Sequence, residues 1–253
     1  MSDILVSSQW LAEHLDDDLV VVDTRPKVAY MYGHIPNSVS ITVEQVISIN
    51  EHGAHLVPEP DVLSGLFGAS GIDRDKTVIV AGEAMDPSLA RVAWTLQYLG
   101  HENLKILDLG ISAWQNTGLA MTRMQPKMAT TKFVPNINSK MRIRAEELKE
   151  KLGSVQILDA RTPQEFFGGH LPGSVLIPFT DGIGQSNIFE SKDNLKRLFE
   201  QKNVLTDREI ICYCMHGHRA SSLFYQLKHA GFDNVRLYDG SFIDWYSRRF
   251  PLQ

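Results

Sequence analysis

The chain contains the same stretch of sequence twice. Residues 20–41 (VVVDTRPKVAYMYGHIPNSVSI) return as residues 156–177 (QILDARTPQEFFGGHLPGSVLI), which gives each copy an Asp-x-Arg and a Gly-His-x-Pro element at an offset of 136 residues. Residues 94–114 match residues 225–245 in the same way, at an offset of 131 residues. The period is much longer than that of solenoid repeats, which predicts two diverged copies of one domain in tandem.

Each copy alternates short apolar runs with segments of helical periodicity. In the second copy, four runs bounded by Gly, Pro, Asp or Thr have the apolar and β-branched composition typical of strands: residues 155–158, 174–178, 209–213 and 234–238. Between them, apolar residues recur at helical spacing, as in the helix expected over residues 220–230. This alternation predicts an α/β fold in which each copy has a mostly parallel central sheet with helices on both faces.

The repeat also predicts the domain organisation. We assign residues 1–118 to a first domain and residues 142–253 to a second. The connection between them, residues 119–141, has no helical period and contains Pro126 and Pro135, as expected of a segment draped over the surface.

Composition excludes several classes of protein. The 253 residues carry a net charge of −5, which argues against a general binder of nucleic acid or of anionic membranes. No apolar run approaches the ~18 residues of a membrane span, and the first residues, MSDILVSSQW, do not resemble a secretory signal. The two cysteines, Cys212 and Cys214, lie two positions apart on one expected strand, a poor geometry for a disulfide. Reduced thiols of this kind indicate a cytoplasmic protein.

The two copies serve as a comparison for each other. Elements present in both copies most simply serve the fold, whereas elements present in one copy are candidates for chemistry. Asp159 and Arg161 have counterparts in the first copy, so we expect them to form an ion pair or loop anchor that supports the site. His34 and His170 also recur, and we expect each imidazole to bond backbone in the turn that Gly and Pro shape.

The copies differ after the expected strand 209–213. At this point the first copy continues with residues 82–88 (GEAMDPS), which contain two carboxylates and no cysteine. The second copy offers a thiol followed by potential cations, in the loop Cys214-Met215-His216-Gly217-His218-Arg219. This loop is therefore the candidate site.

A thiol in this position is suited to nucleophilic chemistry. It follows a parallel strand and precedes a helix, where such sheets place their sites and where loop N–H groups favour negative charge. These surroundings favour the thiolate, the nucleophilic form of cysteine. Arg219 adds a permanent positive charge, while His216 and His218 add charge that depends on pH. Gly217 allows the loop a conformation that a Cβ forbids, and the predicted substrate is a small anion attacked by sulfur.

Together, the tandem repeat, the Asp-x-Arg and Gly-His-x-Pro elements and the CMHGHR loop resemble the two-domain rhodanese family of thiosulfate and 3-mercaptopyruvate sulfurtransferases. The resemblance implies two tandem rhodanese-like domains, of which the first is inactive and the second forms a persulfide on Cys214. It also implies that backbone N–H groups of residues 215–219 hold the persulfide, and that no metal or cofactor takes part.

In the reaction that the resemblance implies, Cys214 takes the outer sulfur of a small anionic donor, thiosulfate or mercaptopyruvate. The persulfide then passes this sulfur to cyanide, a thiol or a thioredoxin-like protein. Mercaptopyruvate-using relatives have neutral loops similar to CG[S/T]GVT, whereas the loop here carries Arg219 and two histidines. Because a dianion gains more from these cations than a monoanion does, we predict thiosulfate as the donor and 3-mercaptopyruvate as the alternative.

Three other interpretations use the same residues. Phosphatases of the same fold resemble Cys-x5-Arg, and the shorter Cys-x4-Arg of Cys214 and Arg219 favours a single sulfur atom over a phosphate. Cys212, Cys214 and the two loop histidines alternate as metal ligands do, but Cys212 is expected inside the strand as a small buried core residue. Domains of this type also act as binding modules once their cysteine is lost, and the presence of Cys214 favours an enzyme.

Overall fold

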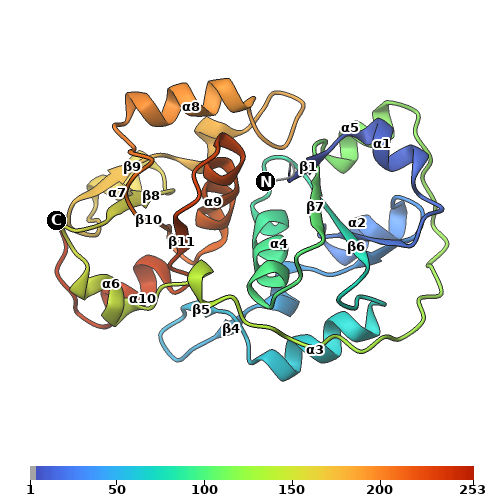
Figure 1. Ribbon diagram of the computed structural model, residues 1–253, viewed down its shortest axis with the longest axis horizontal. Coiled ribbons are helices and arrows are strands. Elements are labelled where there is room, and N and C mark those ends of the chain that lie inside the picture. The colour runs from blue at the N-terminus through green and yellow to red at the C-terminus, as the bar shows by residue number, and fades with distance from the viewer. Residues whose placement is uncertain (1–3) are drawn as a thin grey trace. The chain divides into compact units, whose positions relative to one another are not determined.

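The computed structural model describes residues 4–253 and divides into two compact units (Figure 1). Unit 1 comprises Met1–Val46, Pro58–Ile137 and Gln185–Ile188. Unit 2 comprises Ile47–Val57, Asn138–Gly184 and Phe189–Gln253. Residues 47–57 therefore belong to unit 2, although they lie within the range 1–118 expected for the first domain.

The described part of unit 1 has a five-stranded parallel sheet in the order β1-β7-β6-β2-β3. Its strands are β1 (Leu5–Val6), β2 (Leu19–Asp23), β3 (Ser38–Ser40), β6 (Thr77–Ala81) and β7 (Leu104–Leu107). Its α-helices are α1 (Ser8–Glu13), α2 (Lys27–Tyr32), α3 (Pro60–Ala69), α4 (Ser88–Tyr98) and α5 (Ile111–Asn116). One face of the sheet packs against α1 and α5 and the other against α4, so β2 is buried along its whole length.

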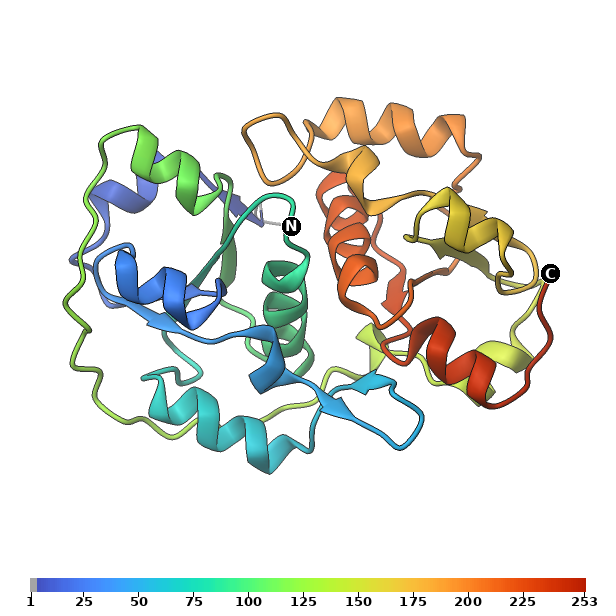
Figure 2. The same cartoon turned by 180° about the vertical axis from the view of Figure 1, so that it is seen from behind.

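Unit 2 has a four-stranded parallel sheet in the order β11-β10-β8-β9. Its strands are β8 (Gln156–Asp159), β9 (Ser174–Leu176), β10 (Ile210–Tyr213) and β11 (Val235–Leu237). Its α-helices are α6 (Ala145–Glu150), α7 (Pro163–Phe167), α8 (Lys192–Gln201), α9 (His218–Ala230) and α10 (Ser241–Ser247) (Figure 2). Two short antiparallel strands, β4 (Ser48–Ile49) and β5 (His55–Leu56), form a hairpin in the same unit.

These two sheets confirm the predicted α/β class, and all four strands expected in the second copy are present. In unit 2, α6 and α10 pack on one face of the sheet and α9 on the other. The expected helix over residues 220–230 begins two residues earlier, at His218, because Gly217 ends the preceding loop in a left-handed conformation. The candidate loop is thus shorter than the sequence suggested.

The Asp-x-Arg elements form the predicted ion pairs. Arg161 Nη2 lies 2.7 Å from the Asp159 carboxylate, and the same guanidinium donates to the carbonyl of Gly169. Arg25 and Asp23 repeat this arrangement in unit 1. Each pair therefore fastens the end of a central strand to the turn after the next helix.

The Gly-His-x-Pro histidines also have the predicted structural role. His34 Nδ1 lies 2.8 Å from the carbonyl oxygen of Tyr30, and His170 Nδ1 lies 3.1 Å from that of Phe166. The backbone of His34 exchanges two hydrogen bonds with Thr122, as the backbone of His170 does with Gln253. Each turn is therefore held by an extended segment that follows the last helix of its repeat.

None of the helices formed by residues 4–253 combines the length and apolar character that crossing a membrane requires.

Candidate active site

Cys214 directly follows β10 at the carboxyl end of the unit 2 sheet, and its side chain and backbone are 1% exposed. Its N–H donates to Ser241 Oγ at 3.1 Å, and its carbonyl accepts the N–H of Phe242 at 2.9 Å. The first turn of α10 therefore holds the start of the loop on both sides of the cysteine.

Ser241 is a supporting residue that the sequence prediction missed. It is fully buried and has a φ of 55°, a left-handed conformation that is uncommon outside glycine. Its hydroxyl donates to the carbonyl of Tyr238 and accepts the N–H of Cys214. These two hydrogen bonds hold Ser241 in this conformation. The first copy has Gly110 at the matched position, and this difference between the copies was the available signal.

The sulfur of Cys214 accepts a hydrogen bond from the loop itself. The N–H of Gly217 lies 3.1 Å from Sγ, and Gly217 has a φ of 87°, which glycine adopts without the steric cost of a Cβ. Gly217 is also the N-cap of α9, a helix of 13 residues. A donated N–H at a helix N-terminus accommodates negative charge on or beside the sulfur.

Further hydrogen bonds hold the loop backbone at the carbonyl groups of Met215 and Gly217. Met215 is anchored through its carbonyl, which accepts the N–H of Ile243 at 3.3 Å. Ser221 donates through both its N–H and its hydroxyl to the Gly217 carbonyl. These bonds leave the conformation of residues 214–217 fixed before any substrate arrives.

Arg219 makes a bidentate ion pair that the sequence prediction did not include. Its Nη1 and Nη2 lie 2.6 and 2.7 Å from the two carboxylate oxygens of Glu165. The hydrogen bonds from Arg219 lower the pKa of Glu165 to about 2, against the opposing effect of burial. The sequence prediction considered the positive charge of Arg219 alone, whereas in the structure the Glu165 carboxylate matches that charge.

Glu165 is positioned by the start of α7. It forms a capping box with Thr162, in which the Thr162 hydroxyl accepts the Glu165 N–H and the carboxylate accepts the Thr162 N–H. The matched residue of the first copy is Ala29. The comparison between the copies, which identified the cysteine loop, therefore also distinguishes Glu165. Glu165 lies within the repeated residues 156–177, whose shared elements we expect to serve the fold.

Three histidines meet beside the loop. His55, on β5, lies with Nδ1 3.1 Å from His218 Nε2, and its ring stacks on that of His216 with 4.5 Å between centroids. Burial lowers the pKa of His216, so the neutral imidazole is favoured near pH 7. No sequence signal marked His55, because it is far from the loop along the chain and the repeat offers no counterpart.

Asp239 fastens the hairpin that carries His55. This buried carboxylate, at the end of β11, accepts the N–H of Val57 at 2.9 Å through one oxygen. Its other oxygen accepts from Arg142 Nε at 2.8 Å. The position of His55 over the loop thus depends on a residue at the carboxyl end of the unit 2 sheet.

The supporting residues lie beneath the loop. The hydroxyl of Tyr213, which precedes Cys214, donates to the Asp159 carboxylate, and the Arg161 guanidinium packs 4.2 Å from the ring centre of Phe242. Cys212 is fully buried within β10, and burial raises the pKa of its thiol. Among residues 4–253, no three His, Cys, Asp or Glu side chains are grouped as a metal site.

The matched loop of unit 1 has a different content. Glu83 accepts the N–H and the hydroxyl of Ser112 at 3.0 and 2.8 Å, so a carboxylate bonds the first turn of α5. In unit 2 the corresponding turn, at the start of α10, bonds the cysteine. The first turn of the matched helix therefore bonds a carboxylate side chain in unit 1 and the cysteine backbone in unit 2.

The pattern of a rhodanese-like domain matches this chain twice, over residues 7–117 and 144–248. The chain therefore belongs to the rhodanese family, and its full-length relatives place it among the sulfurtransferases of that family.

Two curated relatives differ in the donor that their names state. A putative thiosulfate sulfurtransferase of Synechococcus elongatus is 29% identical, covering 98% of this chain and 84% of the relative. The 3-mercaptopyruvate sulfurtransferase of Escherichia coli K12 is 28% identical, covering 96% and 95%. The crystal structure of SseA from Escherichia coli, a 3-mercaptopyruvate sulfurtransferase, superposes with a TM-score of 0.85 at 28% identity, over 95% of this chain and 99% of SseA.

Removal of the His55 ring provides a test of the histidine cluster. We expect His55→Ala to lower kcat/KM for sulfur transfer about tenfold, because the loop histidines lose the ring that positions them. Alkylation of Cys214 by iodoacetamide should become faster in the same variant, because the cover over the loop is reduced. The matched control is His52→Ala, an exposed residue of the same hairpin. Equal effects of the two substitutions would contradict a specific role for His55.

Proposed function

We propose that this protein is a thiosulfate sulfurtransferase that works through a persulfide on Cys214. The observation that carries the proposal is the 3.1 Å hydrogen bond from the Gly217 N–H to Sγ at the start of α9. This N–H is proposed to bond the attacking sulfur and, after sulfur is gained, the persulfide. The remaining N–H groups of residues 215–219 are proposed to complete this cradle.

The proposed reaction has two displacements. The Cys214 thiolate attacks the outer sulfur of thiosulfate, a sulfur–sulfur bond forms, and the bond to the sulfonate sulfur breaks so that sulfite leaves with the electron pair. A nucleophile such as cyanide then attacks the outer sulfur of the persulfide, thiocyanate leaves, and the thiolate is regenerated. A thiol or a thioredoxin-like protein is the proposed acceptor in place of cyanide.

3-Mercaptopyruvate is the second candidate donor, and two findings favour it. The Arg219 charge is matched by Glu165, so the loop offers a dianion less net positive charge than its composition suggests. The relative from Escherichia coli, at 28% identity over most of both chains, is named for this donor. The ratio of kcat/KM for the two donors decides between them, and a higher value with 3-mercaptopyruvate would refute thiosulfate as the preferred substrate.

The persulfide is best tested by intact mass. We expect reduced protein exposed briefly to thiosulfate to gain one sulfur atom, which peptide mapping assigns to Cys214, with release of one equivalent of sulfite. Subsequent cyanide should remove the sulfur as thiocyanate. No adduct on Cys214 would exclude thiosulfate as donor, and turnover of a generic aryl phosphate instead would favour a phosphatase.

We propose that unit 1 has no sulfur-transfer chemistry of its own. The loop at its matched position lacks a cysteine, and both cysteines of the chain lie in unit 2. An adduct that maps outside residues 142–253 would contradict this assignment.

A further inference from the structure

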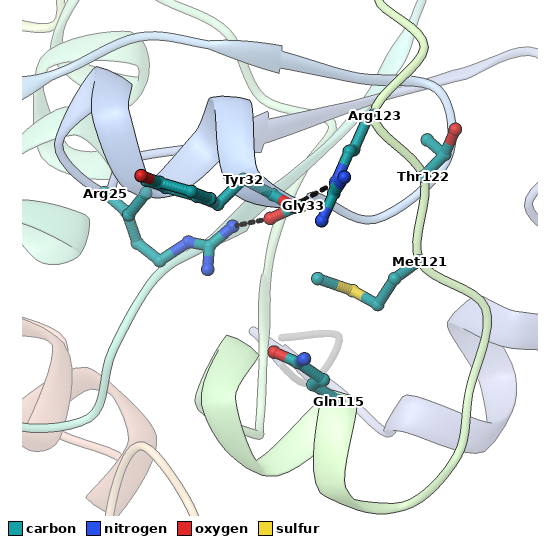
Figure 3. Close-up of a pocket in the computed structure, with 8 residues that line it drawn as sticks. Arg25, Tyr32, Gly33, Gln115, Met121, Thr122 and Arg123 are labelled. Carbon is teal, nitrogen blue, oxygen red and sulfur yellow. Dashed lines mark hydrogen bonds between the residues drawn. The ribbon is translucent and has the colours of Figure 1, made fainter.

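Unit 1 contains a pocket of about 470 Å³ (Figure 3), and the described residues that line it include none of the cysteine loop. Its walls come from Arg25, from the end of α2 and Gly33, from Gln115 on α5, and from residues 121–123. Figure 3 shows the side chains of Arg25 and Arg123 on either side of Gly33, with Met121 extending into the space below them. Of the described residues that line the pocket, none is acidic.

Arg25 contributes a buried guanidinium with one unused end. It is 8% exposed, its Nε and Nη2 bond Asp23, and Nη2 also donates to the Gly33 carbonyl at 2.7 Å. Within residues 4–253, Nη1 has no hydrogen-bond partner. The ion pair with Asp23 therefore fixes the guanidinium rigidly and leaves an N–H donor at the wall of the pocket.

Arg123 contributes a second guanidinium. Its Nε donates to the Tyr32 carbonyl at 2.9 Å, which directs the side chain along the pocket wall (Figure 3). In the described part of the chain no carboxylate forms an ion pair with it. Its two terminal nitrogens therefore remain as the pair of parallel donors that binds a carboxylate in bidentate fashion.

Unit 2 has a pocket of about 350 Å³ at the matched place, with Tyr246 and Leu252 where unit 1 has Gln115 and Met121, but Arg161 is not among the described residues that line it. Its equivalent arginine, Arg161, is 1% exposed because the ring of Phe242 covers the guanidinium. The matched residue in unit 1 is Ile111, which is smaller and has no ring to stack. In the same helix Gln115 stands at the position of Tyr246. Unit 1 therefore has an aliphatic and a polar side chain where unit 2 has two aromatic rings.

We propose that this pocket binds a small organic monocarboxylate. The two guanidinium groups hold the carboxylate, with Arg123 as the main partner and Arg25 Nη1 as a fixed second donor. The Met121 thioether contacts the carbon skeleton, and the Gln115 amide bonds a polar substituent. The guanidinium fork bonds a carboxylate or an inorganic oxyanion, and a carboxylate is favoured because the Met121 thioether supplies an apolar contact for a carbon skeleton.

The test is a titration of the full-length protein with propionate, followed by ¹⁵N–¹H correlation spectra at constant ionic strength. We expect saturable shifts of the Gly33 and Thr122 amides that are separate from any change at Gly217, the reporter for the cysteine loop. Arg123→Gln should weaken the binding about tenfold or more, because it removes a charged bidentate contact. The control Arg74→Gln, at an exposed site of the same unit, should bind as the unmodified protein does.

A second variant keeps the charges and removes the space. Ala29→Met fills the pocket from α2, and we expect it to abolish the saturable shifts while the rest of the spectrum is unchanged. Linear shifts without saturation, or equal affinity in Arg123→Gln, would overturn the proposal. Tighter binding of inorganic phosphate than of propionate would overturn the assignment to a carboxylate. Donor kinetics do not enter this test, so its outcome is independent of the proposed function.

Discussion

A Cys214→Ser variant is expected to lose sulfur transfer by about 10⁴-fold or more in kcat/KM with either donor. A serine hydroxyl is un-ionised near pH 7 and forms no persulfide, although the Gly217 N–H and α9 still surround it. Formation of thiocyanate and release of sulfite measure the loss in the two half-reactions separately. The fold should be unaffected, because two of the hydrogen bonds that fix this residue involve its backbone and a serine hydroxyl can still accept the Gly217 N–H.

Cys212 provides the matched control for that substitution. It lies two residues earlier in β10, is fully buried, and has a thiol whose pKa burial raises. We expect Cys212→Ala to keep most of the activity and to cost about 1 kcal/mol of unfolding free energy, from the small cavity that it leaves. A loss comparable to that of Cys214→Ser would mean that both sulfur atoms take part in sulfur transfer, for example through a disulfide or polysulfide between Cys212 and Cys214.

The second large effect is expected from Arg219→Gln. This substitution leaves the Glu165 carboxylate without its bidentate partner, and in the proposed reaction the neighbouring loop handles an anionic sulfur and an anionic substrate. We expect kcat/KM to fall by about 10²–10³-fold, because an unpaired, partly buried charge is costly and repels both reacting anions. The steady-state rate with thiosulfate and with 3-mercaptopyruvate measures this loss.

The double variant Arg219→Gln/Glu165→Gln separates charge from geometry. It removes both charges and keeps an amide of similar shape, so we expect it to recover at least about tenfold of the activity lost in Arg219→Gln. A double variant as impaired as the single one would show that Arg219 itself bonds the donor, and that Glu165 only orients it.

The same ion pair predicts a pH dependence of stability. The pKa of Glu165 is about 2 in the folded protein against an ordinary value of 4.5, so the pair contributes stability above pH 4.5 and loses it as the pH falls toward 2. We expect the unfolding free energies of the unmodified protein and the double variant to converge over that interval. A difference that stays constant from pH 5 to about pH 2.5 would show that the pair contributes no net electrostatic stability.

The repeated sequence made most of the fold predictable. The four strands of unit 2 follow from short apolar runs, and the ion pairs of Asp23 and Asp159 follow from a motif that occurs in both copies. The position of Cys214 after β10 was predictable for the same reason, since a parallel strand that enters a loop and a helix has few possible geometries.

The partners of the loop were less predictable, for physical reasons that differ between residues. Glu165 lies within a repeated block, and its difference from Ala29 was visible, but its distance from Arg219 depends on how α7 packs beside α9. His55 gives no local signal at all. Its contact with His218 depends on tertiary packing, which neither periodicity nor spacing along the chain encodes.

The hairpin over residues 47–57 shows that unit 2, which contains Cys214, is not formed by one continuous segment of the chain. A fragment cut at residue 142 would retain Cys214, its loop and the whole parallel sheet of unit 2. It would lack the imidazole stacked on His216, and the Asp239 carboxylate would lose the Val57 N–H that it accepts. Unit 2 therefore includes eleven residues that lie within the sequence range of the first repeat, so the boundary between the repeats is not a place where the chain can be cut without loss from unit 2.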